Sequence, residues 1–162
     1  MVRNKEGKIL IVDNDVMVYI FHDLFTSNRD FAMRVIQYLS LKYSRMWIPK
    51  EIRNEFLLKR KDKRRLKIMD KICEAYPIIS ACPIKVAKHE IKIFVGIGDD
   101  NRGEADAILQ SIKAKTKDNL FFEDIVFLSN DRNALLLARR NSVATLPYGT
   151  LRVNLREVGI TF

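Results

Sequence analysis

The chain has 162 residues, 48% of them apolar and 30% charged, and its 29 basic residues against 20 acidic ones give a formal net charge of +9. This length and composition are typical of one globular domain with a sizeable core, and they exclude a disordered chain. No apolar run reaches the roughly 20 residues of a membrane helix, and the first eight residues lack the apolar core of a signal peptide. We therefore expect a single domain over residues 1–162, located in the cytoplasm, with no membrane partner.

The predicted elements alternate short apolar strands with segments that carry apolar residues at helical spacing. In chain order they are a strand at 8–13, helices at 15–25 and 29–42, a strand at 46–48, two helices within 51–76 that break near residue 62, and a strand at 78–80. Helices at 84–95 and 104–115 follow, separated by a loop at 96–103, then a strand at 125–128, a helix at 131–140, a strand at 143–146 and one short helix after 148. This alternation predicts an α/β fold with a short, mostly parallel central sheet flanked by helices.

The basic excess favours polyanionic partners, because neutralising phosphates releases condensed counterions. It is equally compatible with a protein that is merely soluble. Cys73 and Cys82 do not form a C-x-x-C pair, and His22 and His89 are far apart in sequence. A zinc site needs more nitrogen and sulfur ligands than these residues offer at plausible spacing, so we expect reduced thiols and no zinc.

Two of the predicted strands end beside an aspartate, Asp13 after the first and Asp131 after the fourth. In open parallel sheets, binding sites form beyond the carboxyl ends of the strands, near the point where the strand order reverses. An aspartate after a strand is also a good helix N-cap. Both interpretations stay open for each residue.

Further carboxylates lie in the opening turns of predicted helices. Glu55 lies on the helix that begins at Pro49, and Glu104 and Asp106 fall in the first turn after Gly103. Acids at these positions also complement the helix dipole. Because Glu104 and Asp106 are about 200° apart around a helix, periodicity does not choose between them as a functional acid.

Taken in order, four motifs of the sequence resemble those of the PIN-domain family of nucleases. They are the apolar strand ending in Asp13-Asn14-Asp15, Pro49 followed six positions later by Glu55, the acidic start of an Ala-rich helix at Glu104-Ala105-Asp106, and the apolar strand followed by Ser129-Asn130-Asp131. With the strands and helices around the motifs, the resemblance covers the chain from about residue 8 to 146. The resemblance implies a single PIN-like domain, similar to the small stand-alone PIN nucleases that act as toxins.

The resemblance also implies a reaction: hydrolysis of nucleic-acid phosphodiesters, with RNA favoured over DNA, by carboxylates gathered around Mg²⁺ or Mn²⁺. The implied catalytic acids are Asp13, Glu55, Asp106 and Asp131. Asp13 is expected as the central metal ligand, Asp106 and Asp131 as further ligands, and Glu55 as the residue that binds a second ion or orients the nucleophile. Oxygen ligands suit these ions, which lower the pKa of bound water and offset charge on the transition state.

Members of the family commonly have two small hydroxyl residues after the first aspartate, whereas this chain has Asn14 and Asp15. Asp15 could join the metal shell or cap the next helix, and the cap is favoured. At the third motif the resemblance favours Asp106, with Glu104 as an additional candidate metal ligand. Ser129 is expected to hydrogen-bond an acid or a substrate phosphate. A protein antitoxin and a homodimer are the partners that the family implies.

The densest basic run is a candidate for contact with a nucleic-acid backbone, and it is equally typical of a solvated helix face. Its candidate residues are Lys59, Arg60, Lys61, Lys63, Arg64 and Arg65. No aromatic residues are interleaved with this run, so it predicts no base-stacking platform.

Two other functions stay open. One is a non-catalytic PIN-like module that binds nucleic acid or assembles with other proteins, against which the presence of all four motif acids counts. The other is an α/β phosphatase or receiver-like domain, which also uses an aspartate after the first strand. Such domains usually need a partner lysine or a second aspartate in a motif that is not found here.

Overall fold

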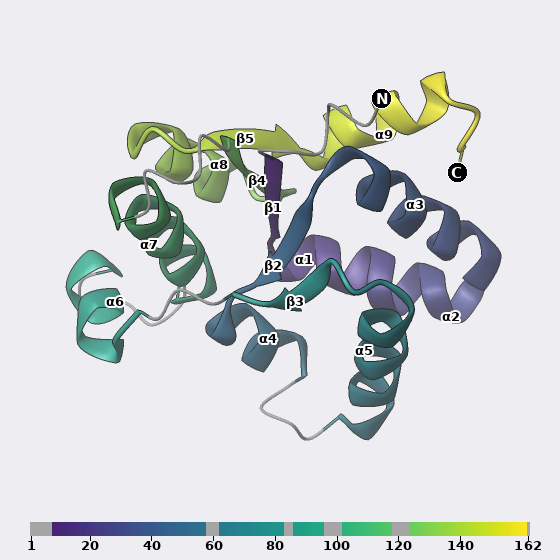
Figure 1. Cartoon of the computed structure of the whole chain (residues 1–162), viewed down its shortest axis with the longest axis horizontal. Helices are drawn as coiled ribbons and strands as arrows, with labels where there is room; N and C mark the ends of the chain where they lie inside the picture. The colour runs from purple at the N-terminus through teal and green to yellow at the C-terminus, as the bar shows by residue number, and fades with distance from the viewer. Residues whose placement is uncertain (1–7, 58–61, 83–85, 96–101, 118–123, 162) are drawn as a thin grey trace.

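A computed structural model of the chain shows an α/β fold around an all-parallel sheet (Figure 1). The structure describes residues 8–57, 62–82, 86–95, 102–117 and 124–161, with the backbone alone for residues 92–95, 102–104, 114–117 and 124. Within these residues the strands are β1 (Lys8–Val12), β2 (Arg45–Ile48), β3 (Ile79–Ala81), β4 (Asp124–Ser129) and β5 (Ala144–Pro147). The expected α/β architecture, a short parallel sheet flanked by helices, is confirmed.

The helices connect the strands, as a parallel sheet requires. They are α1 (Asn14–Met17), the π-helix η1 (Val18–Leu24), α2 (Phe25–Ser27), α3 (Arg29–Lys42), α4 (Lys50–Phe56), α5 (Lys63–Ala75), α6 (Lys88–Val95), α7 (Arg102–Lys117), α8 (Arg132–Arg140) and α9 (Tyr148–Glu157). In the view of Figure 1, α2, α3 and α5 lie to one side of β1 and β2, and α6 and α7 lie to the other. No helix within the described ranges is both long and apolar enough to cross a membrane.

The predicted helices are present, with differences at their ends that have local causes. Pro49 is the N-cap of α4 and not its first helical residue, and its carbonyl accepts the first helical hydrogen bond from Arg53. After the break between the two predicted helices, α5 begins just beyond Asp62. The Asp62 carboxylate caps this helix by accepting hydrogen bonds from the N–H groups of Arg64 and Arg65. α6 begins at Lys88, later than expected, and most of the expected loop at 96–103 falls outside the described residues.

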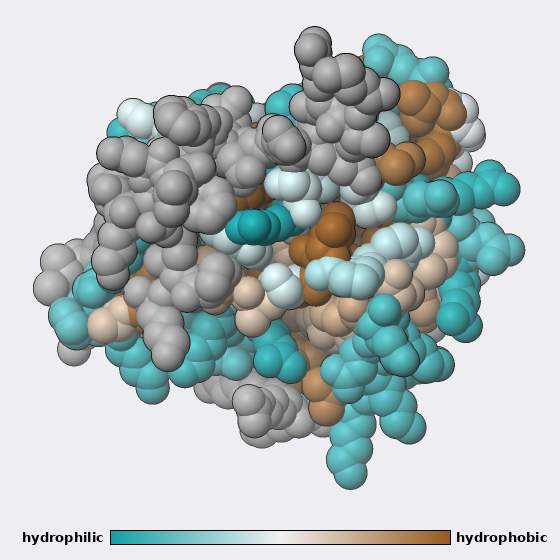
Figure 2. All heavy atoms as spheres, in the orientation of Figure 1, coloured by the Kyte–Doolittle hydropathy of each residue, from teal (hydrophilic) through white to brown (hydrophobic). Residues whose placement is uncertain are grey.

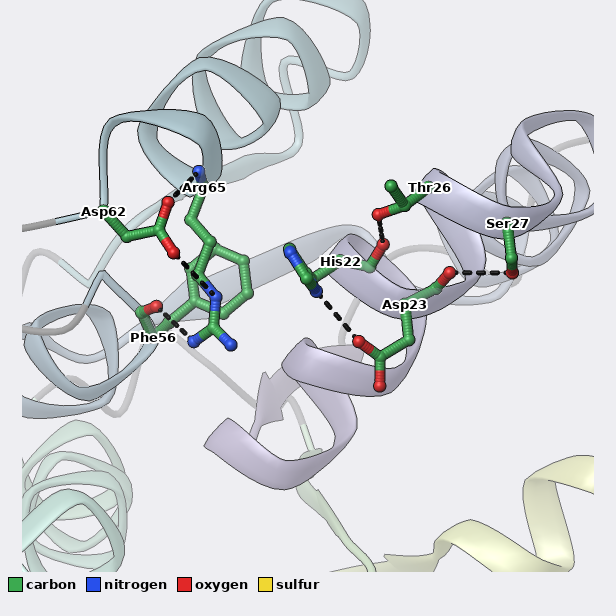
Figure 3. A network of polar contacts seen from close by, with 7 residues as sticks. All are labelled: His22, Asp23, Thr26, Ser27, Phe56, Asp62 and Arg65. Carbon is green, nitrogen blue, oxygen red and sulfur yellow. Dashed lines mark hydrogen bonds and ion pairs between the residues drawn. The ribbon is translucent and has the colours of Figure 1, made fainter.

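The segment expected as one helix over 15–25 is helical from residue 14 to 27 but changes its hydrogen-bond pattern in η1. Side chains support the carbonyl groups of this segment: the Thr26 hydroxyl donates to the carbonyl of His22, and the Ser27 hydroxyl donates to that of Asp23 at 2.8 Å (Figure 3). Short π segments inside α-helices are frequent at functional sites. Apolar periodicity alone did not reveal the π turn.

The core forms around β1, the central strand. Ile9, Leu10 and Ile11 are completely buried, as expected for a parallel strand covered on both faces. Figure 2 shows hydrophilic side chains along much of the right and lower edges of the visible face, with hydrophobic side chains near its middle and at its upper right. Among the described residues, the charged side chains that are buried are those of Asp13 and Asp106.

The strand order β3-β2-β1-β4-β5 reverses between β1 and β4: successive strands are added on one side of β1 and then on the other. From β1 the chain moves outward to β2 and β3, whereas β4 and β5 occupy the other half of the sheet. The two central strands pair in parallel, with Val12 opposite Leu128. Their carboxyl ends therefore lie side by side at the topological switch point, where open α/β sheets form binding sites.

Candidate functional site

Asp13 is the first residue beyond β1 and is only 5% exposed. Its backbone N–H donates to the carbonyl of Leu128 at 2.8 Å, which continues the pairing of β1 with β4. Its carboxylate accepts two hydrogen bonds, on Oδ1 from the backbone of Asn14 at 2.8 Å and on Oδ2 from the Ser129 hydroxyl at 2.7 Å. The carboxylate is therefore held in one orientation at the end of the central strands.

Ser129 joins the two strand ends. Its hydroxyl donates to Asp13 Oδ2 and accepts from the backbone N–H of Asp131 at 2.9 Å, and the residue is fully buried. A hydroxyl can do both, because it has one donor and two acceptor sites. Ser129, the last residue of β4 and the first of the Ser-x-Asp motif, thus fixes both Asp13 of the first motif and the turn that carries Asp131.

Asp15 and Asp131 lie next to Asp13 in this arrangement. Asp15 Oδ2 accepts from the backbone N–H of Asn130 at 3.1 Å, and its Oδ1 accepts from Val16 at 2.7 Å. Asp131 caps α8, with Oδ1 accepting from Asn133 at 2.8 Å. We call Asp13, Asp15 and Asp131, together with Asn14 and Ser129, the aspartate cluster.

The expected roles of these acids as helix caps are resolved residue by residue. Asp131 is the N-cap of α8. For the helix after β1, however, the N-cap is Asp13, not Asp15. Asp15 lies in the first turn and bonds across to the β4–α8 turn, so it ties two loops together.

The cluster disfavours its own negative charge. Burial is the main cause that raises the pKa of Asp13 to about 6, and the neighbouring carboxylates of Asp15 and Asp131 raise it further, against the lowering effect of the hydrogen bonds from Ser129 and Asn14. Burial also raises the pKa of Asp15. A bound cation would relieve both effects.

Asn14 adds an oxygen to the cluster that has no hydrogen-bond partner. Its Oδ1 is buried and accepts no hydrogen bond within the described part of the chain. Each carboxylate oxygen of Asp13 accepts one hydrogen bond although it has two lone-pair sites. Carboxylate and amide oxygens are the donor set that Mg²⁺ and Mn²⁺ prefer, so the residues present fit a hard divalent cation in their chemistry.

Asp106 lies on α7 and is 2% exposed. Its Oδ2 accepts from the backbone N–H of Glu51 at 3.0 Å, and its Oδ1 accepts from Nε2 of Gln110 at 3.0 Å. Because Pro49 gives α4 no side-chain cap, Asp106 satisfies one of the open N–H groups of that helix from another element. Burial raises the pKa of Asp106 to about 6; the Glu51 carboxylate adds to this, whereas the Glu51 N–H, Gln110 and Lys50 oppose it.

A cavity of about 480 Å³ opens beside Asp106. Glu51 and Gln110 line it together with Lys50 and Arg53, and its walls include apolar residues. The Oε1 atom of Gln110 is buried without a hydrogen-bond partner among the described residues. The acid of α4 that borders this cavity is Glu51, which was not a candidate from the sequence.

The predicted acids therefore fall into more than one group. Asp13 and Asp131 meet in the aspartate cluster, Asp106 is bonded to α4 and Gln110, and Glu55 is exposed on α4. Glu104 belongs to α7, but its side chain falls outside the described atoms. Over the described ranges, no three His, Cys, Asp or Glu side chains are arranged so that they could hold a metal ion.

The residues of the basic run also differ in their surroundings: some are exposed, and one is bonded within the fold. Lys63 and Arg64 are exposed at the start of α5, whereas Arg65 is half-buried. The Arg65 guanidinium donates to the carbonyl of Phe56 at 2.8 Å, lies 5.4 Å from the centre of the Phe56 ring and pairs with Asp62 at 3.7 Å. It joins α4 to α5. The remaining candidates, Lys59, Arg60 and Lys61, lie outside the described residues.

Comparison of the sequence with protein-family models found no match, and comparison with curated proteins found none either.

Proposed function

We propose that this chain is a nuclease of the PIN type that hydrolyses nucleic-acid phosphodiesters with the help of Mg²⁺ or Mn²⁺, and that RNA is its preferred substrate. The observation that carries the proposal is the buried Asp13 carboxylate, bonded to Ser129 beside Asp15 and Asp131 at the switch point of a parallel sheet. Burying one carboxylate beside two others is unfavourable unless a cation compensates for the charge. The four sequence motifs add weight from the family that they resemble.

Residues of the aspartate cluster would bind the cation, and basic residues would bind the substrate. Asp13, with its orientation fixed by Ser129, would be the central ligand of the cation. Asp131, Asp15 and the amide oxygen of Asn14 would complete the oxygen set after their side chains turn toward the ion, since over the described residues no three acidic side chains are already arranged to hold one. When bound, the cation supplies an activated water and offsets the charge that develops on the phosphate in the transition state. The basic residues of α5 would hold the phosphate backbone near the site.

Asp106 and the acids of α4 would form the second half of the site. Asp106 fixes the start of α4 through the Glu51 N–H, and so sets the position of both acids on that helix. Glu55 is retained as the residue that binds a second ion or orients the nucleophile, and Glu104 as a further ligand. Glu51 joins them as a candidate, since it borders the cavity beside Asp106.

The test is cleavage of labelled single-stranded RNA and single-stranded DNA with Mg²⁺, with Mn²⁺ or with EDTA. Asp13→Asn is the test variant, and Asp30→Asn, an exposed aspartate of α3, is the matched control. We expect metal-dependent cleavage of RNA that Asp30→Asn retains and that Asp13→Asn loses by about 100-fold or more. An undiminished rate in Asp13→Asn would remove the cluster from the mechanism.

A second function is favoured by one observation: Asp131 and Asp106 both have structural duties as helix caps. A module that binds nucleic acid without cleaving it would need these two aspartates only to cap their helices. Binding of RNA with no cleavage in any metal would support this alternative.

The toxin role comes from the resemblance, as do a protein antitoxin and a homodimer, whereas the cytoplasmic location is the expectation from the sequence alone. If the chain is a toxin, its induced expression in a bacterial host should arrest growth, and Asp13→Asn should abolish the arrest. Growth arrest by both proteins would exclude RNA cleavage as its cause.

A further inference from the structure

We propose that Tyr19 and Tyr148 form a stacking platform for an unpaired nucleobase of the substrate, next to the aspartate cluster. The inference rests on the proposed function, because it assigns a part of the same substrate to a second place on the protein. It concerns a groove of about 430 Å³ that is lined by both tyrosines, Asn130, Gly149 and Arg152.

The two rings are already stacked on each other. Their centroids are 5.6 Å apart and their planes are inclined by only 6°. Tyr148 is 9% exposed, whereas Tyr19 is 46% exposed, so the inner ring supports the outer one and part of the outer ring remains in solvent. An aromatic ring held in this way can stack on any base, because every base has a π face.

Distant parts of the chain build this platform. Tyr19 belongs to η1, the π segment that follows α1, and Tyr148 is the first residue of α9. A side chain added at Gly149 would meet nothing within 4 Å, so there is open space next to Tyr148. Tyr19 lies within a π turn, and such turns recur at functional sites.

The platform and the aspartate cluster share one turn of the chain. Asn130 lines the groove, and its backbone N–H donates to Asp15 Oδ2 at 3.1 Å. On either side of it, Ser129 bonds Asp13 and Asp131 caps α8. A single strand whose phosphate lies at the cluster would therefore bring a neighbouring base to the tyrosines.

The composition of the groove favours a base over a simple anion. Asp23 also lines it, with its Oδ1 at 2.8 Å from Nδ1 of His22 (Figure 3). A carboxylate there repels phosphate, but its oxygens can accept hydrogen bonds from the amino groups of bases. Arg152 supplies a planar cation to the same lining, suited to a base edge or to the adjoining phosphate. Phenol rings with one acid and one guanidinium are a surface on which an unpaired base can stack and bond.

The experiment measures stacking directly. A single-stranded RNA that carries 2-aminopurine at successive positions is bound to Asp13→Asn protein, so that no cleavage intervenes, and its fluorescence is recorded. Tyr19→Ala and Tyr19→Leu remove the ring, the second keeping apolar bulk, and Tyr19→Phe keeps the ring. Tyr38→Ala, on α3, is the control for loss of a tyrosine elsewhere.

We expect quenching of 2-aminopurine at one position by the parent protein, by Tyr19→Phe and by Tyr38→Ala. Both Tyr19→Ala and Tyr19→Leu should lose the quenching and bind the RNA about 5- to 150-fold more weakly. Equal quenching and affinity in all five proteins would overturn the platform. A change of sedimenting mass in Tyr19→Ala or Tyr19→Leu, without loss of quenching, would overturn it as well, since the ring would then be a protein contact.

Failure of the platform is distinguishable from failure of the nuclease. If the unsubstituted protein cleaves RNA, and Tyr19→Leu binds and cleaves RNA with the same affinity and rate, the platform is wrong and the nuclease stands. If no cleavage occurs but quenching depends on Tyr19, the platform stands on a protein that binds without cutting.

Discussion

The hydroxyl of Ser129 donates a 2.7 Å hydrogen bond to Oδ2 of Asp13, across 116 positions of sequence and between the ends of two paired strands. The bond stabilises the ionised carboxylate, since it lowers the pKa of Asp13 against the raising effect of burial. The same hydroxyl accepts from the N–H of Asp131. One side chain therefore sets both the charge and the position of the aspartate cluster.

Replacing Ser129 with alanine should destabilise the fold most strongly where Asp13 is ionised. A hydrogen bond to a charged group contributes about 1.5–3 kcal/mol, and the variant loses it together with the acceptor for Asp131. We expect a loss of this size in the free energy of unfolding by urea at pH 8, and a smaller loss at pH 4. Ser80→Ala, an exposed serine of β3, should change little at either pH. A pH-independent loss in Ser129→Ala would show that the bond does not act on the charge.

The pH dependence of stability should reveal the raised pKa of Asp13. The folded protein holds the proton more tightly than the unfolded chain, because the pKa is raised from 3.8 to about 6. The stability that the folded protein gains from holding this proton more tightly is therefore complete below pH 3.8, and it is lost as pH rises through about 6. Asp13→Asn avoids this loss, so above pH 6 it should be more stable than the unsubstituted protein, by about 3 kcal/mol at most for a shift of two units.

Urea unfolding of the two proteins from pH 4 to pH 8, in EDTA, checks this prediction. The difference between them should shrink toward zero at the acidic end. Asp30→Asn provides the reference for an exposed aspartate. If Asp13→Asn is less stable than the unsubstituted protein at pH 8, the bonds of the carboxylate outweigh its burial, and the electrostatic interpretation fails.

Divalent cations should offset the loss of stability that ionisation of the buried Asp13 causes. An ion that binds only the folded protein stabilises it by mass action, by about 2.7 kcal/mol at 100 times its dissociation constant. We expect Mg²⁺ or Mn²⁺ to raise the thermal midpoint at pH 7.5 and to have less effect at pH 5, where protons compete for Asp13. EDTA should return the midpoint to its starting value, and Asp13→Asn should abolish the shift. An equal shift in Asp13→Asn would place the ion elsewhere.

Much of this arrangement follows from the sequence. Strands that are buried on both faces read as continuous apolar runs, and Asp13 and Asp131 follow two such runs. Parallel strands present their carboxyl ends at one edge, so the sequence predicted that these two residues would be near each other. Their meeting needed only the additional fact that β1 and β4 are neighbours.

Other contacts could not be derived, because no local pattern encodes them. Asp106 caps α4 across 55 positions, and the pairing depends on how α4 and α7 pack. Glu51 and Glu55 are four residues apart and so lie on similar sides of a helix. Only tertiary packing distinguishes them, leaving Glu51 half-buried and Glu55 exposed. The stack of Tyr19 on Tyr148 has the same origin, since it joins η1, near the start of the described chain, to α9, its last helix.

The cap that Asp106 gives to α4 should be separable from any catalytic duty. Asp106→Asn keeps an oxygen that can accept from the Glu51 N–H, whereas Asp106→Ala does not. We expect Asp106→Ala to lower the free energy of unfolding by about 0.5–2 kcal/mol, as loss of an N-cap does, and Asp106→Asn to stay closer to the unsubstituted protein. Both should lose RNA cleavage if the charge is needed. Full cleavage by Asp106→Asn would reduce Asp106 to a structural role.

The two kinds of basic residue at the start of α5 should respond differently to substitution. Lys63 and Arg64 are exposed, so the double change to alanine should weaken RNA binding and reduce its salt dependence, by about 0.7 in the logarithmic slope for each phosphate that is no longer neutralised. Arg65 is bonded to Phe56 and Asp62, so Arg65→Ala should instead lower stability with a smaller effect on the slope. Titrations of labelled RNA from about 50 to 200 mM salt, with urea unfolding alongside, separate the two. If the Lys63 and Arg64 double variant keeps the original slope, this end of α5 is a solvated helix face and the nucleic acid lies elsewhere.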